Sequence, residues 1–170
     1  MKTSDVLVDA FGRIRHLVDR SVAGLDAAAL AFRPDADANP IGWLVWHLTR
    51  IQDDHVAEIA GLGQIWTTAG WGDRFGMPAD PHDTGFGHTS EQVAAFTPPN
   101  PEALVDYHSS VSNHTLEYLA TIDADELDRV IDTSYDPPVR VGVRLISVIS
   151  DNLQHAGQAM YVRGIIERTR

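Results

Sequence analysis

Two polar side chains interrupt an apolar stripe near the end of the sequence. Asp151 and His155 are four residues apart, so a helix would place them one turn apart on the same face. That face also carries Val148, Ala159 and Val162, all within about 40° of one line along the helix. Burying a carboxylate among apolar side chains costs roughly several kcal/mol unless an opposite charge or a metal ion compensates it. The spacing therefore indicates either an ion pair or a pair of metal ligands.

His47 is the third candidate ligand. It lies at the edge of the apolar stripe of an earlier expected helix, where it could face Asp151 and His155. The chain contains no cysteine, so its metal ligands must be histidines and carboxylates. From spacing alone the alternative is favoured, in which Asp151 and His155 form an intrahelical ion pair and His47 is a hydrogen-bonded core histidine.

Two carboxylates follow His47 along the same helical line. Asp54 and Glu58 are two and three turns away, roughly 10 Å or more along the axis, so neither can share an ion with His47 directly. Either could bind substrate or orient a ligand, although a solvated face or a local ion pair is the favoured interpretation because carboxylates mostly stay exposed. We take Asp54 as a candidate substrate-binding residue.

Arg144 and Gln158 are the other candidate substrate-binding residues. Arg144 lies two turns before Asp151 on the same line, where it would point toward a pocket or cover the end of the helix bundle. Gln158 follows His155 by three residues and would either anchor that histidine or bond to a neighbouring helix.

Further histidines and aromatic residues have weaker cases. His55 and His108 lie in apolar stripes, and we expect satisfied core histidines rather than partners of metal ligands. A glycine-rich and proline-rich stretch carries aromatic side chains that would either cover the metal or close one end of the core. These are Trp66, Trp71, Phe75, Phe86 and His88.

Length and charge limit the classes of function. The 170 residues fit a single domain spanning 1–170. A net charge of -11 argues against nucleic-acid binding, which needs clustered Lys and Arg, and no apolar run is long enough to cross a membrane. We expect a cytoplasmic protein with a small-molecule substrate, and a homodimer remains open.

Four segments with helical periodicity must position these residues. They cover about 7–22, 41–59, 104–122 and 141–166, and Asn-Pro pairs at 39–40 and 100–101 give two of them a typical start. A connection of nearly forty residues, 62–100, separates the second segment from the third, and a capping box from Thr89 to Gln92 predicts a short helix inside it. The expected fold is all-α, a four-helix bundle with a long crossover between helices two and three. We expect helices one and four among the neighbours of helix two.

Two segments carry a resemblance to a known family. Residues 39–48, which read NPIGWLVWHL, and residues 151–158, which read DNLQHAGQ, resemble the two signature segments of the DinB-like superfamily. Those signatures are a histidine on helix two and a His-x-x-x-His-x-Gly-Gln pattern on a later helix. The resemblance implies a four-helix bundle whose ligands, here His47, Asp151 and His155, hold zinc, nickel or a similar divalent ion. Residues 71–76 and 85–89 also look like the crossover of actinobacterial members.

One ligand departs from the common pattern. Asp151 stands where many relatives have histidine. The mycothiol-dependent maleylpyruvate isomerases of the superfamily are similar in using a carboxylate there, a glutamate followed four residues later by histidine. That similarity implies mycothiol as a co-substrate.

Three functions follow as hypotheses. The first is a metal-dependent transferase or isomerase in which the ion activates an exogenous low-molecular-weight thiol, mycothiol. The second is hydrolysis of a small molecule by metal-activated water, with Asp54 or Glu58 as the base. The third is a metal-binding or ligand-binding module without catalysis.

Overall fold

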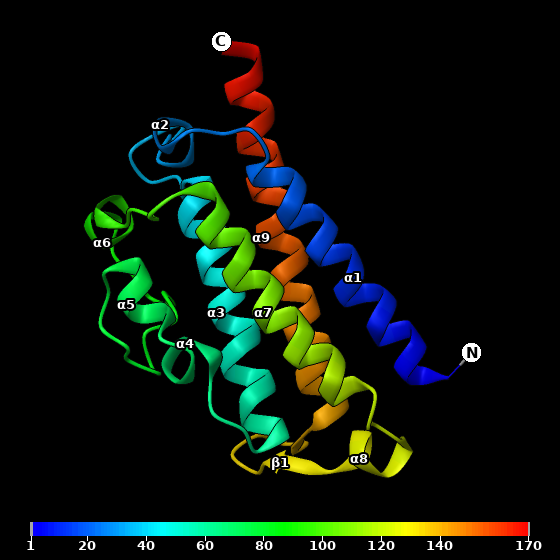
Figure 1. Cartoon of the computed structure of the whole chain (residues 1–170). Helices are drawn as coiled ribbons and strands as arrows, with labels where there is room; N and C mark the ends of the chain where they lie inside the picture. Colours follow the sequence, from blue (N-terminus) through cyan, green and yellow to red (C-terminus); the bar gives the residue numbers. More distant parts are fainter. Residues whose placement is uncertain (1, 170) are drawn as a thin grey trace.

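Four long helices form a bundle in the computed structural model, which describes residues 2–169. They are α1 (Thr3–Val22), α3 (Ile41–Ala60), α7 (Pro101–Leu119) and α9 (Val141–Thr169) (Figure 1). α1 and α9 run in one direction, and α3 and α7 run in the other (Figure 1). The predicted all-α bundle is therefore confirmed, including a crossover that joins two parallel helices.

The order of the helices around the bundle differs from one expectation. α3 packs mainly against α9 and α7, and α1 packs against the same two helices from the opposite corner. α9 is thus the predicted neighbour of α3, but α1 touches α3 only slightly. The expectation was wrong for α1 because an apolar stripe shows which face is buried without showing which helix covers it.

Capping residues define the ends of two of the long helices. The side chain of Asn100 accepts a hydrogen bond of 2.7 Å from the backbone N–H of Ala103, so the predicted cap of α7 is present. α3 begins one residue later than expected, with Pro40 rather than Asn39 as its N-cap. It ends at Ala60 and is capped by Gly61, whose φ of 67° lies in the left-handed region that glycine adopts readily.

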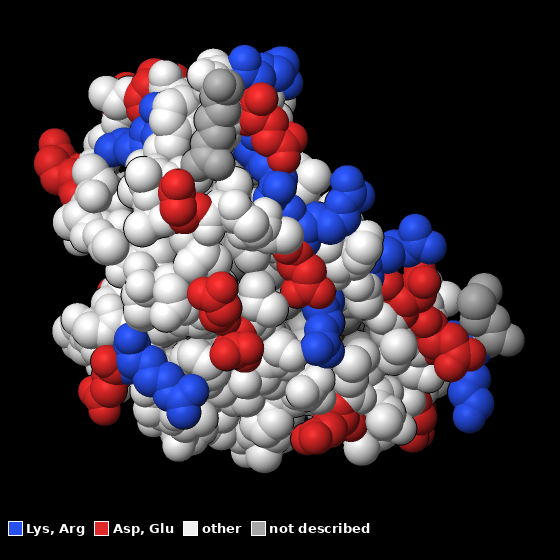
Figure 2. Space-filling view, turned by 45° about the horizontal axis from the view of Figure 1, so that its top comes forward, with Lys and Arg blue, Asp and Glu red and all other residues white. Residues whose placement is uncertain are grey.

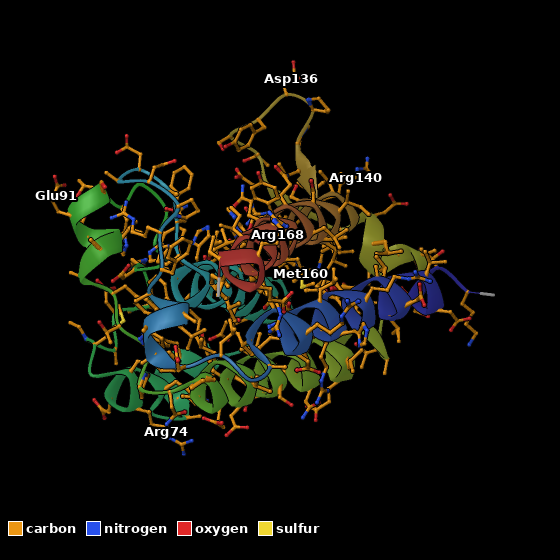
Figure 3. The ribbon with its side chains drawn as sticks, turned by 90° about the horizontal axis from the view of Figure 1, so that it is seen from above. Arg74, Glu91, Asp136, Arg140, Met160 and Arg168 are labelled. Atoms are coloured by element: carbon orange, nitrogen blue, oxygen red, sulfur yellow. The ribbon has the colours of Figure 1, made fainter. Side chains whose placement is uncertain are left out.

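Short elements occupy the connections. The crossover contains a capping box at Thr89, where the backbone N–H donates to Oε1 of Gln92 at 2.8 Å, and the expected helix α6 follows it. Before α9, the chain forms a two-stranded antiparallel sheet with Asp136 in its loop, which projects away from the bundle (Figure 3). The short elements are α2 (Ala27–Leu30), α4 (Ile65–Thr68), α5 (Trp71–Phe75), α6 (Ser90–Ala95), α8 (Ala124–Asp128), β1 (Val130–Asp132) and β2 (Val139–Arg140).

Aromatic side chains of the crossover extend the core. The rings of Trp66, Trp71 and Phe75 are buried, and their centroids lie 5.4, 5.3 and 6.0 Å from that of Tyr107 on α7. These three residues close the core beside α7, so they do not cover the candidate metal ligands. Phe86 is different, because 87% of its surface is exposed.

The surface is mixed in charge. On the face shown in Figure 2, Lys and Arg side chains are interleaved with Asp and Glu side chains. Within residues 2–169, none of the helices is long and apolar enough to cross a membrane.

Candidate metal centre

His47 lies in the middle of α3 with only 4% of its surface exposed. Its Nδ1 is 2.5 Å from the backbone carbonyl oxygen of Thr84, in the crossover. Because a carbonyl only accepts, Nδ1 must carry the proton, which leaves the lone pair of Nε2 free. The ring of Trp43 stacks on the imidazole, with centroids 4.7 Å apart and planes 12° apart, and holds its orientation. His47 is therefore fixed in the tautomer that a metal ligand needs.

His155 has the same arrangement on α9. Its Nδ1 is 2.9 Å from Oε1 of Gln158, so the amide oxygen accepts the Nδ1 proton and Nε2 is again free. Nε2 lies 3.5 Å from Oδ1 of Asp151, one helical turn earlier. Of the two interpretations of Gln158, the structure thus shows an anchor for His155 rather than a bond between helices.

His47, Asp151 and His155 converge in space. Each offers one ligand atom, and these atoms lie within 4.8 Å of one another. In a tetrahedral zinc shell the ligand atoms would be roughly 3.4 Å apart, so small side-chain movements would close the group around one ion. Oδ2 of Asp151 is buried and has no hydrogen-bond partner among the described residues. A divalent ion fits this site, because it would satisfy a buried carboxylate oxygen that is otherwise unpaired.

The electrostatic environment of the two histidines also suits metal binding. Burial lowers the pKa of His47, and its hydrogen bond to Thr84 opposes this only in part, so the ring is held neutral. Burial lowers the pKa of His155, but hydrogen bonds to Asp151 and Gln158 outweigh this effect, so that its pKa is raised overall. In the protonated ring the second proton lies on Nε2, 3.5 Å from Asp151, and it would leave when an ion binds, since histidine ligands must be neutral.

A buried arginine holds the crossover that supplies Thr84. Arg50 has 0% of its surface exposed, and its guanidinium donates to the backbone oxygens of Asp83 at 3.1 Å and Pro81 at 3.0 Å. The charge is balanced by Asp53, 3.5 Å away, whose carboxylate also accepts the backbone N–H of Trp66 at 2.8 Å. Sequence reasoning missed this pair, although an arginine and an aspartate three residues apart in an apolar helix were the available signal.

A second anchor lies on the other side of Thr84. The carboxylate of Asp83 accepts hydrogen bonds from Nε2 of His88 at 3.0 Å and from the backbone N–H of Gly85 at 3.2 Å. The indole N–H of Trp43 donates to Nδ1 of His88 at 3.2 Å. His88 thus positions the segment beside His47 and does not itself point a free nitrogen at the ligands.

A cavity of about 400 Å³ opens beside Asp151. Asp54 lines it, so this carboxylate lies near the candidate centre without joining the group of three, and its role in substrate binding stays a prediction. The lining residues are Ile51, Asp54, His55, Thr84, Phe86, Ser147, Val148 and Asp151.

Arg144 lies next to this cavity but does not line it. Its guanidinium donates to Oε2 of Glu58 at 2.8 Å and to Nδ1 of His55 at 2.8 Å. Both partners are on α3, so Arg144 joins α9 to α3 near the end of the bundle. Substrate binding by Arg144 stays a prediction.

His108 is a satisfied core histidine. Its Nδ1 is 3.1 Å from the hydroxyl of Thr49, which itself donates to the backbone oxygen of Val45 at 2.7 Å and so accepts from His108. The hydroxyl of Ser112 lies 3.3 Å from Nε2. His108 is therefore used within the core, as expected.

Comparison with known proteins agrees with this architecture. The family model described as the DinB superfamily matches residues 10–159. Among solved structures, the chain is similar to a conserved protein from Enterococcus faecalis, with 28% sequence identity, a TM-score of 0.89 and 96% of each chain covered. No curated protein matches the chain.

Proposed function

Because the chain belongs to the DinB superfamily, we propose that it is a metal-dependent enzyme in which His47, Asp151 and His155 hold one divalent ion. The observation that carries the proposal is the convergence of two free Nε2 atoms on a carboxylate with an unpaired buried oxygen. Two imidazoles and one carboxylate suit zinc or nickel. Three protein ligands also leave a coordination position for a substrate, which is typical of catalytic rather than structural sites.

The reaction we propose is a transfer or isomerisation that uses an exogenous low-molecular-weight thiol, mycothiol. When bound, the ion lowers the pKa of a coordinated thiol, which then reacts as a thiolate near neutral pH. The chain has no cysteine to supply such a nucleophile itself. The cavity beside Asp151 gives the thiol or its acceptor access to the centre.

The protein groups have separate tasks in this proposal. Thr84 and Gln158 keep the protons of His47 and His155 on Nδ1, so that both Nε2 atoms face the centre. Asp151 supplies the anionic ligand, which lowers the net charge of the loaded site. Phe86 forms part of the cavity wall beside the centre.

Hydrolysis of a small molecule is the second candidate. It is favoured by the position of Asp54, a carboxylate in the cavity wall that could accept a proton from water. Glu58 is less suited to that task, since it is bound to Arg144 at 2.8 Å.

A cobalt-substituted protein separates the two candidates. Adding mycothiol should produce a sulfur-to-metal charge-transfer band, and an analogue with a hydroxyl in place of the thiol should not. Asp151→Ala should lose the band together with the metal, which elemental analysis would show. Identical spectra with the thiol and its analogue would contradict thiol activation and leave hydrolysis as the better account.

A further inference from the structure

The cavity beside Asp151 has a polar end formed by Asp54. Oδ1 of Asp54 accepts a hydrogen bond of 2.7 Å from the side-chain amide of Gln64. Oδ2 has no hydrogen-bond donor among the described residues, and Nδ1 of His55 lies 3.7 Å away. A carboxylate oxygen therefore faces a cavity wall without a partner.

His55 cannot supply a proton to Asp54 through Nδ1. That nitrogen lies 2.8 Å from NH1 of Arg144, and an arginine only donates, so Nδ1 must accept. Burial and the charge of Arg144 lower the pKa of His55, which keeps the ring neutral. The charge of Arg144 is itself balanced by Glu58 at 2.8 Å. The carboxylate of Asp54 is thus left uncompensated at this end of the cavity.

An exposed aromatic ring stands in the same cavity wall. Phe86 is 87% exposed, and it lies between Gly85 and Gly87, whose φ angles are 85° and 79°. The two glycines allow a tight turn that carries the ring out of the core, whereas two other aromatic residues of the crossover, Trp66 and Phe75, are buried. Phe86 and Asp54 line the same cavity, and an aromatic ring together with a carboxylate suits the binding of an organic cation.

We propose that Asp54 and Phe86, which both line this cavity, form a subsite for a cationic amine. The proposal rests on the proposed function, because the other end of the same ligand would reach the ion beside Asp151. Ile51 and Val148 line the cavity together with these residues and suit a short aliphatic linker. The ligand class is therefore a small molecule with a metal-binding group at one end and an ammonium group at the other.

Matched pairs of alkanethiols test the subsite. An aminothiol and a hydroxythiol of equal chain length would be titrated into the cobalt-substituted protein, and the charge-transfer band would report each Kd. At the chain length that spans the cavity, the aminothiol should bind about tenfold tighter than the hydroxythiol, as expected for an ion pair combined with a cation–π contact. Asp54→Asn should bring the two affinities together. Phe86→Leu, which keeps an apolar side chain, should reduce the preference about threefold.

Two controls make the result specific. Glu117→Gln removes a charge from an exposed position of α7, which does not line the cavity, and should leave the preference unchanged. A thiol-free pair, n-butylammonium and n-butanol, would be titrated into the zinc-loaded protein and followed by NMR. Only the ammonium should shift the backbone signals of residues 84–88, and Asp54→Asn should abolish that shift.

The outcomes separate this inference from the proposed function. A missing band with every thiol, together with Asp54-dependent binding of n-butylammonium, would reject thiol activation and retain the amine subsite. A charge-transfer band with equal Kd values for both members of each thiol pair, and no selective ammonium shift, would overturn the subsite and retain thiol activation. A preference that survives Asp54→Asn would also overturn the subsite.

Discussion

The backbone carbonyl oxygen of Thr84 lies 2.5 Å from Nδ1 of His47, so the crossover determines which nitrogen of a helix α3 histidine is free. Gly85 follows Thr84 directly and passes close to the same imidazole. A Cβ atom at Gly85 would lie 2.7 Å from Cζ3 of Trp46 and 3.2 Å from Nδ1 of His47. The close approach and the φ of 85° both require glycine at this position.

Gly85→Ala should weaken the metal site as well as the fold. The added methyl group would push the crossover away from α3 and lengthen the hydrogen bond between Thr84 and His47. We expect unfolding free energy to fall by about 2 to 4 kcal/mol, from strain and overpacking together. Metal affinity should fall by about tenfold or more, as is typical when the partner of a ligand is lost. Urea denaturation and calorimetric zinc titration would measure the two effects.

Gly87→Ala is the matched control for that variant. Gly87 has a similar φ of 79°, but a Cβ atom there would have no neighbour within 4 Å. Its substitution should cost only about 1 kcal/mol of backbone strain and leave metal affinity unchanged. Equal losses of zinc affinity in both variants would show that close packing at Gly85 is not what holds His47.

Gln158→Leu should reduce metal affinity while the bundle stays folded. It removes the acceptor that holds the Nδ1 proton of His155, 2.9 Å away. Loss of such a partner typically costs about 10-fold to 100-fold in affinity. Gln158→Glu keeps an acceptor and should restore binding, whereas Gln154→Leu, one turn earlier and bonded to Ser150, should have no effect. Competition with a zinc-sensitive dye would rank the four proteins.

His155→Ala should abolish retention of the ion. Two ligands, His47 and Asp151, would remain, which is too few for a stable site at neutral pH. Elemental analysis of protein purified without chelator should give about one ion per chain for the wild type and close to none for the variant. His16→Ala, at an exposed position of α1, is the control. Unchanged stoichiometry in His155→Ala would falsify the assignment of the ligands.

The candidate ligands and one of their supports, Gln158, could be predicted from the sequence, but the support of His47 by Thr84 could not. Asp151 and His155 share a helical face by their spacing, but spacing alone favoured an ion pair and a core histidine, and the resemblance to the DinB-like superfamily was needed to group them with His47. The Thr84 carbonyl is invisible to such reasoning, because any residue has a carbonyl and only the path of the loop aims it. Regular periodicity specifies helices, whereas the crossover depends on many irregular backbone contacts.

Arg50 shows the same limit. Its spacing from Asp53 was visible in the sequence, but its contacts with the crossover were not, since these acceptors are backbone oxygens of Pro81 and Asp83 rather than side chains. Arg50→Met should lower the unfolding free energy by about 3 to 5 kcal/mol, because it leaves Asp53 as an uncompensated buried charge. It should also weaken zinc binding, since the segment before Thr84 loses its anchor.

A surface pair provides the comparison for Arg50. Arg13 bonds to Asp9 at 2.6 Å, but both side chains are largely exposed. Arg13→Met should therefore leave the unfolding free energy almost unchanged. Urea denaturation of both variants would test the contrast, and a small loss in Arg50→Met would mean that the buried network is dispensable.

Buried His108 should make the fold sensitive to acid. Burial, followed by the charge of Arg15, lowers the pKa of His108 from 6.5 to about 3, so the folded protein keeps this ring neutral. In the unfolded chain the ring takes up a proton below pH 6.5, which means that the unfolded state binds more protons between these two pKa values. Stability should therefore be unaffected by His108 above pH 6.5 and should fall as the pH drops toward 3.

The size of that effect is limited by linkage to about 1.4 kcal/mol per pH unit for a single group. Urea denaturation at a series of pH values, with a chelator present so that no ion contributes, would give the dependence of stability on pH.

His108→Gln removes the titrating group and should be less stable than the wild type at neutral pH, because Thr49 and Ser112 lose well-placed partners. Its stability should nevertheless decline less steeply on acidification, so the two curves should approach each other. His16→Gln, at an exposed site, should run parallel to the wild type. Parallel curves for His108→Gln as well would show that proton uptake by this buried ring does not drive acid unfolding.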